Sequence, residues 1–433
     1  MGDDQGVSFE DILEMFMESQ HWSPDVMRDF QRSQLEQLLR HARANVPFYE
    51  QRLDCMFRRD DSIDWNRWDE IPLLTRADVQ ENRMALLARA LPPGHGGWEE
   101  HSTSGSTARP ITLRIPHLMA NAGLASWVRS YRAHGIPDTA RFAYVQSLIG
   151  EVAADNEEYQ IRQYATDNKP RVTMVSRDLS AGRKLEIFAE LQTDILIDSP
   201  NALEILAHQN DKRSDPVRIT WVLGFGMGFT PEQIILIEKS FGTQVLSAYS
   251  SKEAGPIAQQ CPGSRNYHVN EELVVVERQL SGVSNIIVTP LFQSAQPLIR
   301  YVHNDMVRLK QSCGCGYQHL TITTIDGRSE PIFKMPNGVS IVPTMVDITK
   351  SEFHKICMSI QLAQTAPASF ELRYMADRLA TERELGPVRA ILHRQLGSDI
   401  HLQILKVDFI LANPGGKQQR FVREYDLESI QAK

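Results

Sequence analysis

The spacing of hydrophobic and polar positions changes along the chain, and each spacing predicts a different kind of element. In residues 9–54, apolar side chains recur every three or four positions, which predicts amphipathic helices. Ser23 followed by Pro24 is typical of a helix start, because serine caps the first turn and proline fits its first position. Thr75, placed before Asp78, indicates another helix start.

From residue 140 to residue 330, short apolar runs alternate with amphipathic segments. Strands that alternate with helices favour a parallel sheet in an α/β architecture. Thr230-Pro231 is a helix start and Gly242 a helix stop. The runs predict strands at 141–149, 194–200, 219–226 and 243–250, and helices at 179–192 and 230–242.

The last third of the chain has two other textures. Residues 272–309 contain short strand-like runs separated by turns, which predict an antiparallel sheet or a small barrel. Residues 330–433 read as a small α+β domain. Its predicted strands lie near 370 and at 402–411, and its predicted helices lie near 344–358 and 376–396.

The expected fold class is therefore α/β. A large N-terminal domain, residues 1–328, would hold mixed or parallel sheets flanked by helices and a small antiparallel β region. A small, mobile α+β domain would follow at residues 329–433, because the turn at 327–330 separates the two textures.

Composition narrows the class of protein. The chain has 433 residues, 42% of them hydrophobic and 23% charged, which is typical of a globular protein. A net charge of −8 without a dense basic run argues against nucleic acid or anionic lipid as a partner. We see neither an apolar run of membrane-spanning length nor a secretory leader, so we expect a cytoplasmic protein.

Residues 102–110, STSGSTARP, form a loop dense in hydroxyl side chains. Hydroxyls and backbone N–H groups can surround an anion, and glycine lets the backbone approach it closely. A plain polar surface loop is the alternative for this segment alone. The glycine–lysine pattern of P-loop nucleoside triphosphatases does not occur here.

The hydroxyl-rich loop resembles the TSGST phosphate loop of the adenylate-forming enzymes, and further sequence blocks downstream strengthen the resemblance. Ordered blocks similar to those of this superfamily follow at 223–230, 247–256, 297–305, 325–343 and 413–424. The N-terminal stretch ANVPFYEQRL, residues 44–53, is similar to the opening of phenylacetate–CoA ligases. The chain departs from the family pattern at Ala108, Ser250, Lys252 and Asn304.

The resemblance implies a role for particular residues. ATP phosphates would lie on Ser102, Thr103, Ser104, Gly105, Ser106 and Thr107. Gly224 and Tyr249 would border adenine, and Asp305 would accept the ribose hydroxyls. Glu253 would bind Mg²⁺, and Arg328 would contact ribose or phosphate. Glu330 would be the hinge and Lys417 the catalytic lysine that reaches the α-phosphate.

The implied activity is ATP-dependent conversion of a carboxylic acid to acyl-AMP, followed by transfer to coenzyme A. An aromatic or arylacetic acid fits this branch. Glu151 and Asp155 are candidate partners for an amino or hydroxyl substituent, and an exposed acidic loop is the favoured alternative for both. Candidate pocket walls are Phe142, Tyr144, Ser147, Phe225, Ala248 and Pro256.

Other readings stay open. The acceptor could instead be an amine, a hydroxyl or the thiol of a carrier protein. A catalytically silent, zinc-stabilised binding protein is an alternative of another class. The long N-terminal helical segment needs a surface to pack on, which a homodimer would provide.

Three cysteines and a histidine form a further candidate site. Cys261, Cys313, Cys315 and His268 supply the soft donors that suit a structural Zn²⁺, with His319 as a reserve ligand. Gly314 and Gly316 would let the Cys-x-Cys segment bend. The alternative is three reduced thiols that lie close together by chance. The sequence places Cys55 and Cys357 in apolar helical contexts, so we expect core positions for both.

Overall fold

The computed structural model contains two compact units. Met1–His101 and Thr112–Gly327 belong to the first, and Arg328–Lys433 belongs to the second. The structure describes residues 7–102, 111–146, 158–161, 171–176, 179–225, 228–278, 285–328, 333–336, 340–341, 348, 351–410 and 419–425. Within these ranges, none of the helices combines the length and the apolar character that crossing a bilayer requires.

The first unit opens with the predicted helices. Ser8 and Asp11 form a reciprocal capping box at the first helix, and Ser23 caps the second, whose first residue is Pro24. The bounds are α1 (Phe9–Ser19), α2 (Pro24–Asn45), η1 (Pro47–Tyr49), η2 (Asp54–Met56), η3 (Trp65–Glu70) and α3 (Arg76–Glu81). A two-stranded sheet of β1 (Trp98–Ser102) and β2 (Thr112–Pro116) follows, and then α4 (His117–Ala133).

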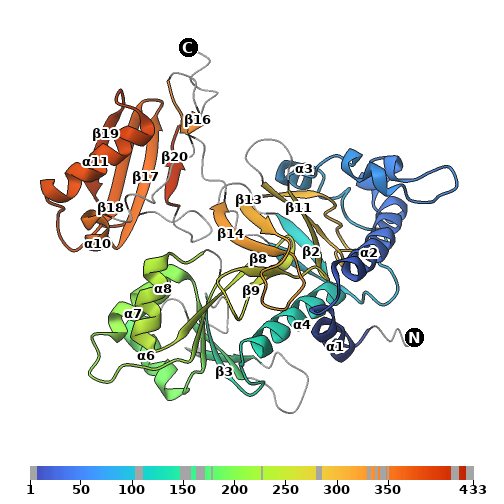
Figure 1. The fold of residues 1–433 in the computed structure, drawn as a ribbon, viewed down its shortest axis with the longest axis horizontal. Helices are drawn as coiled ribbons and strands as arrows, with labels where there is room; N and C mark the ends of the chain where they lie inside the picture. The colour runs from blue at the N-terminus through green and yellow to red at the C-terminus, as the bar shows by residue number, and fades with distance from the viewer. Residues whose placement is uncertain are drawn as a thin grey trace. The chain divides into compact units, whose positions relative to one another are not determined.

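A twelve-stranded sheet organises the first unit (Figure 1). Five consecutive strands of it are parallel, in the order β5-β3-β6-β7-β8. Their bounds are β3 (Arg141–Gln146), β5 (Arg171–Ser176), β6 (Ile195–Asp198), β7 (Trp221–Gly224) and β8 (Gln244–Ser251). The four strands predicted between residues 141 and 250 are thus confirmed, and β4 (Glu158–Ile161) adds an antiparallel edge.

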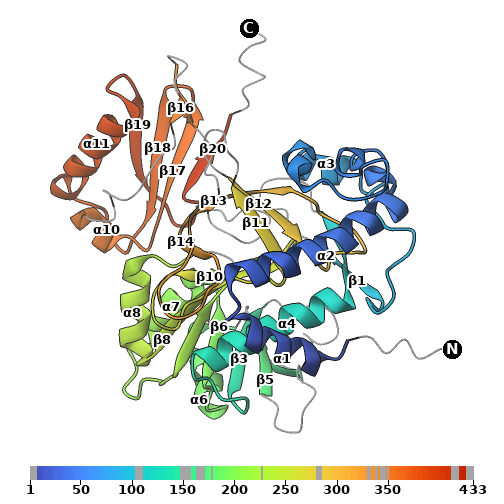
Figure 2. The ribbon, with the colours of Figure 1, turned by 45° about the vertical axis from the view of Figure 1, so that its right-hand side comes forward.

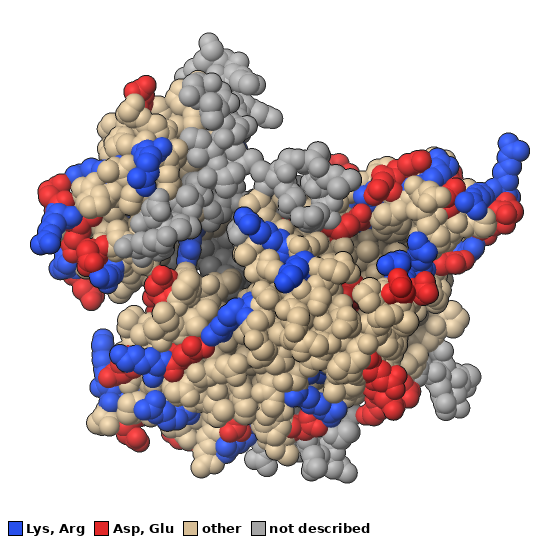
Figure 3. All heavy atoms as spheres, in the orientation of Figure 1, with Lys and Arg blue, Asp and Glu red and all other residues tan. Residues whose placement is uncertain are grey.

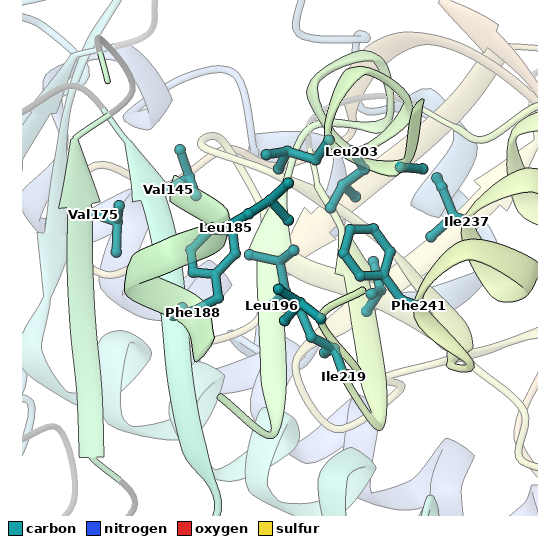
Figure 4. Close-up of a cluster of buried hydrophobic side chains, with 14 of the residues drawn as sticks. Val145, Val175, Leu185, Phe188, Leu196, Leu203, Ile219, Ile237 and Phe241 are labelled. Atoms are coloured by element: carbon teal, nitrogen blue, oxygen red, sulfur yellow. The ribbon is translucent and has the colours of Figure 1, made fainter. Parts of the chain in front are cut away.

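Helices cover the two faces of this parallel segment. On one face, α6 (Ala181–Glu190), α7 (Pro200–Asn210) and α8 (Pro231–Phe241) pack on the cluster drawn in Figure 4, which includes Phe188 and Phe241. On the other face, Trp127 and Tyr131 of α4 pack on Phe142 and its neighbours. Burial of apolar surface on both faces accounts for the continuous apolar runs of these strands.

The same sheet continues into antiparallel strands. These are β9 (Gly255–Gln260), β10 (Tyr267–Val269), β11 (Val274–Arg278), β12 (Asn285–Pro290), β13 (Tyr301–Lys310) and β14 (Thr321–Arg328). The antiparallel region predicted for 272–309 is therefore confirmed, and it shares one sheet with the parallel strands because β8 pairs with both β7 and β9. On the face drawn in Figure 3, acidic and basic side chains are interspersed, which agrees with the mixed composition.

The second unit is a small α+β fold. A four-stranded sheet has the order β19-β18-β17-β20, and its core includes Phe353, Phe370 and Phe421. The elements are β15 (Phe333–Lys334), β16 (Ser340–Ile341), α10 (Glu352–Ile356), β17 (Ser359–Ala366), β18 (Ser369–Met375), α11 (Glu382–Leu396), β19 (His401–Lys406) and β20 (Phe421–Arg423). The prediction missed β17. Only two residues separate β17 from the end of α10, so the change from helical to strand spacing of apolar residues is hidden.

Candidate active site

Tyr249 and Asp305 meet in the structure, although they come from different strands. The Tyr249 hydroxyl donates to Asp305 Oδ2 at 2.8 Å, and both residues are buried. Their strands, β8 and β13, are four steps apart in the sheet order, which a flat sheet would hold about 19 Å apart. The antiparallel part of the sheet therefore curls, and the curl brings together the residues expected at adenine and at ribose.

An irregularity in β13 places the carboxylate. Between Val302 and Met306, β13 advances four residues while its partner β12 advances only from Ile287 to Asn285. A bulge of this kind changes where side chains point, and bulges are frequent beside active sites. His303 and Asp305 lie in the bulge, with His303 Nδ1 at 2.9 Å from Asp305 Oδ2.

Glu253, the expected magnesium ligand, lies in the turn between β8 and β9. Its Oε1 accepts a hydrogen bond from Arg76 Nη1 at 3.2 Å, and its side chain is 12% exposed. Arg76 is the first residue of α3, whose N-cap Thr75 forms a capping box with Asp78. A carboxylate is a hard oxygen ligand that suits Mg²⁺, but the guanidinium occupies one of its oxygens here. Arg76 was not predicted as a site residue.

The loop after β7 explains why residue 224 is glycine. A Cβ at Gly224 would lie 2.1 Å from the Phe229 ring, so a side chain cannot fit there. Phe225 follows at once, and its ring meets that of Tyr144 edge to face with 5.3 Å between the centroids. Two of the candidate pocket walls therefore lie side by side, at the carboxyl-terminal half of β3 and just beyond β7, where open α/β sheets bind ligands.

The other candidate pocket residues differ in how far their side chains are buried. Phe142 is 4% exposed and packs on Tyr131, so the structure gives it a core position. Ala248 is half-buried on β8. Pro256 on β9 faces α4, where a Cβ at Gly123 would touch its ring at 3.4 Å.

Several expected site residues lie outside the described part of the chain. These are Thr103, Ser104, Gly105, Ser106, Thr107, Ser147, Glu151, Asp155, Glu330 and Lys417. Ser102 ends β1 and Arg328 ends β14, and for these two only the backbone is described.

The cysteine–histidine cluster assembles from three segments. Cys261 follows β9, His268 lies on β10, and Cys313 and Cys315 lie in the turn between β13 and β14. The four potential ligand atoms all lie within 4.8 Å of one another. Positive φ angles of 81° at Gly314 and 105° at Gly316 make the tight turn, as the sequence suggested.

The distances within the cluster fit a tetrahedral metal. Cys261 Sγ lies 3.7 Å from Cys313 Sγ, and His268 Nε2 lies 3.3 Å from Cys313 Sγ and 3.2 Å from Cys315 Sγ. Ideal Zn–S and Zn–N bonds would give S···S edges of about 3.8 Å and S···N edges of about 3.6 Å. Three sulfurs and one imidazole would fill all four positions, as in closed structural sites.

His268 is held in the state that a metal needs. Burial lowers its pKa to about 4, and the neighbouring His319 and Arg129 act in the same direction. The ring is therefore neutral at pH 7, with Nε2 directed at two thiols. Its Nδ1 is buried without a partner among the described residues, beside a cavity of about 30 Å³ that has room for a water molecule.

A buried ionic network lies behind the cluster. Arg129 on α4 donates to Glu272 Oε1 at 2.5 Å and to Asn270 Oδ1 at 2.8 Å. Ser19, the last residue of α1, also donates to Glu272. His319 is 3% exposed and contacts the Ser19 carbonyl, so the reserve ligand lies in this network instead of the cluster. Figure 2 shows α1 and α4 side by side, and Arg129 of α4 donates to the Phe16 carbonyl of α1.

The two remaining cysteines lie apart from the cluster. Cys55 is half-buried in η2. Cys357 caps the C-terminus of α10 and packs against the core of the second unit, and burial raises the pKa of its thiol to about 12. Both positions suit packing better than reactivity.

Proteins with similar sequences are phenylacetate–CoA ligases. The chain is 25% identical over 347 residues to the phenylacetate-coenzyme A ligase of Pseudomonas putida, and the aligned stretch covers 75% of each chain. It is 22% identical over 386 residues to that of Aromatoleum evansii, which covers 84% of this chain and 83% of the relative. No family model matches the chain.

Among solved structures, a 2-hydroxyisobutyryl-CoA ligase in the postadenylation state has the same fold. The TM-score is 0.70 at 16% identity, over 100% of this chain and 96% of that chain. At this identity, the likeness concerns the fold. In sequence the chain is thus similar to phenylacetate–CoA ligases, and its fold is that of a solved acyl-CoA ligase.

Proposed function

We propose that this protein is an AMP-forming acid–CoA ligase. It joins a carboxylic acid to AMP with release of pyrophosphate, and then transfers the acyl group to the thiol of coenzyme A with release of AMP. The relatives in sequence are phenylacetate–CoA ligases, which supports this reaction.

The observation that carries the proposal is the contact of Tyr249 with Asp305. The two residues come from separate sequence blocks that resemble the adenine and ribose blocks of the superfamily, and the fold joins their side chains at 2.8 Å. In the proposed reaction, the Tyr249 ring packs against adenine and Asp305 accepts hydrogen bonds from the ribose diol. Both carboxylate oxygens of an aspartate can accept, which suits two neighbouring hydroxyls.

Charge must be offset where the acid attacks the α-phosphate. Lys417 is the proposed cation for this step, because an ammonium aimed at the developing charge stabilises it strongly. Glu253 is the proposed magnesium ligand, and a bound Mg²⁺ would neutralise charge on the phosphates. Because Arg76 shares the Glu253 carboxylate, we propose that this guanidinium moves towards the phosphates when the metal binds.

The proposed substrate class is an aromatic or arylacetic acid. The perpendicular pair of Tyr144 and Phe225 supports this class, since an aromatic ring packs favourably against such faces and edges. Pyrophosphate release with ATP, Mg²⁺ and a panel of benzoic, arylacetic and short aliphatic acids tests the proposal, with and without coenzyme A.

Release that depends on one aromatic acid, with a CoA thioester detected by mass, is the expected result. Acid-dependent release without a thioester would move the acceptor to an amine, a hydroxyl or a carrier-protein thiol. Asp305→Ala should raise the KM for ATP, whereas Asp138→Ala, at an exposed ion pair with Arg132, should not. Failure of every acid to elicit release, together with absence of ATP binding, would contradict the proposal.

A structural zinc is the second part of the proposal. The ligand atoms of Cys261, His268, Cys313 and Cys315 lie close enough to share one ion, and the donor set suits Zn²⁺. The ion would tie the turn after β9 to the β13–β14 turn. Reduced thiols of this kind fit the proposed cytoplasmic location. A homodimer and a carrier-protein partner stay as proposals that size measurement and acyl transfer can test.

A further inference from the structure

His303 has an environment that the roles assigned above do not explain. Its side chain is 10% exposed, and Nδ1 lies 2.9 Å from Asp305 Oδ2. Its other ring nitrogen, Nε2, is buried without a hydrogen-bond partner among the residues that the structure describes. The polar contacts of this interior histidine are therefore made by Nδ1, to the carboxylate expected at ribose and, at 3.5 Å, to the Tyr249 hydroxyl.

The direction of the hydrogen bonds follows from chemistry. An ionised carboxylate can only accept, so the proton of the contact lies on His303 Nδ1. The Tyr249 hydroxyl donates to the same oxygen, Oδ2, at 2.8 Å. Two donors on one oxygen restrict rotation of the Asp305 carboxyl group about its last torsion, which is otherwise broad.

Packing holds the histidine ring in place. The rings of Tyr249 and Tyr301 both meet His303 nearly at right angles, each with 6.1 Å between centroids. His303 also lies in the bulge between Val302 and Met306, where the local backbone departs from regular pairing. The ring is therefore fixed by neighbours on two sides before any nucleotide arrives.

We propose that His303 is a positioning residue for recognition of ribose. Its Nδ1–H holds the Asp305 carboxylate in the orientation that accepts both ribose hydroxyls, and so makes the site select ribonucleotides over 2′-deoxyribonucleotides. The inference rests on the proposed function, because it takes Asp305 to be the ribose ligand. Because the fold already orients the Asp305 carboxylate, binding the ribose diol costs less conformational entropy, which makes the two hydrogen bonds more favourable.

The test measures binding of ATP and of 2′-deoxy-ATP by calorimetry, which requires no knowledge of the acid. We expect the wild-type protein to prefer ATP by about tenfold or more, the scale of one hydrogen bond to a charged group. His303→Leu should reduce this preference to less than about threefold, chiefly by weakening ATP binding. His134→Leu, which alters a half-buried histidine at the C-cap of α4, should leave the preference unchanged.

Two amide variants separate the ring nitrogens. In His303→Asn, the amide nitrogen reaches the position of Nδ1 and should restore most of the preference. In His303→Gln, the amide nitrogen reaches the position of Nε2 instead, so this variant should lose the preference for ATP as His303→Leu does. Rescue by glutamine and not by asparagine would overturn the role through Asp305. An unchanged preference in His303→Leu would overturn it as well.

Folding and function are read separately. Poor folding of His303→Leu would weaken both nucleotides alike, so the ratio of the two affinities reports only recognition of the sugar. Tyr249→Phe, which removes the second donor to Oδ2, should lower the same ratio and serves as a second variant. A wild-type protein that binds ATP but does not prefer it would contradict this inference and leave the ligase proposal standing. A wild-type protein without ATP binding would contradict both.

Discussion

Arg129 and Glu272 form an ion pair at 2.5 Å whose partners are 7% and 0% exposed. The pair joins α4 to the segment after β10, and Arg129 also donates to the carbonyl of Phe16 in α1. Burial raises the energy of an ionised carboxyl, but Arg129, His319 and Ser19 outweigh it and lower the pKa of Glu272 to about 2. The carboxylate is therefore charged at pH 7 and depends on its partners.

Arg129→Met should destabilise the first unit by ~3–5 kcal/mol, because it leaves a buried carboxylate without its cation. Unfolding in urea, followed by tryptophan fluorescence, measures the effect, since all six tryptophans lie in that unit. Arg132→Met is the matched control on the same helix. Arg132 pairs with Asp138 at 40% and 50% exposure, so its loss should cost less than ~1 kcal/mol. Equal effects of the two variants would contradict the role of burial.

Metal content should follow the cysteine–histidine cluster. Protein purified under reducing conditions should contain about one zinc per chain, as measured by elemental (inductively coupled plasma) mass spectrometry. Removal of the zinc by a chelator should lower the melting temperature of the first unit. Cys315→Ser should lose most of the zinc, because a hydroxyl is a poor replacement for a thiolate. Cys55→Ser should keep it, since Cys55 lies outside the cluster. Zinc-free protein with a melting temperature indifferent to chelators would rule the site out.

Stability should depend on pH through Glu271. Partial burial raises the pKa of Glu271 to about 7, despite a hydrogen bond from the Leu320 N–H, and the charge of Glu272 adds to the rise. A folded pKa above the ordinary 4.5 means that the folded state prefers the protonated acid. Its contribution is therefore complete below the ordinary pKa and is lost as the pH rises through 7.

Glu271→Gln removes this titration and keeps an acceptor for Leu320. The melting temperature of the variant, relative to wild type, should rise between about pH 5 and about pH 8. Glu14→Gln, at an exposed position of α1, should show no such trend. A constant difference across this range would show that Glu271 does not titrate there.

Adenylation should depend on Lys417. Lys417→Ala should slow acyl-AMP formation by a factor on the order of 10²–10³, because it removes a preorganised charge at the transition state. Lys355→Ala, at an exposed lysine paired with Glu352, should have no effect. Thioester formation from supplied acyl-AMP should survive better than adenylation in Lys417→Ala. A catalytically silent binding protein would show no acyl-AMP formation in either variant or in wild type.

Local chemistry made much of this protein predictable from its sequence. Ser23, Thr75 and Thr230 cap helices because the side-chain oxygen and the orphan N–H groups are only three residues apart. Gly242 ends α8 with a φ of 65°, which glycine adopts without strain. The apolar runs predicted the parallel strands for the same reason, since burial on both faces leaves a continuous apolar pattern. The four cysteine and histidine positions were also identifiable, because the chain has only five cysteines and two of them form a Cys-x-Cys segment.

The tertiary structure decided which distant side chains share a site. Tyr249 and Asp305 are 56 residues apart, and only the curl of the sheet joins them. His303 showed no signal in the sequence, because its function depends on a bulge that no local pattern encodes. Arg76 and Glu253, 177 residues apart, pair for the same reason. Hydrogen bonds and ion pairs act over a few ångströms, whereas local sequence patterns carry information over a few residues, so the fold alone brings such partners within range.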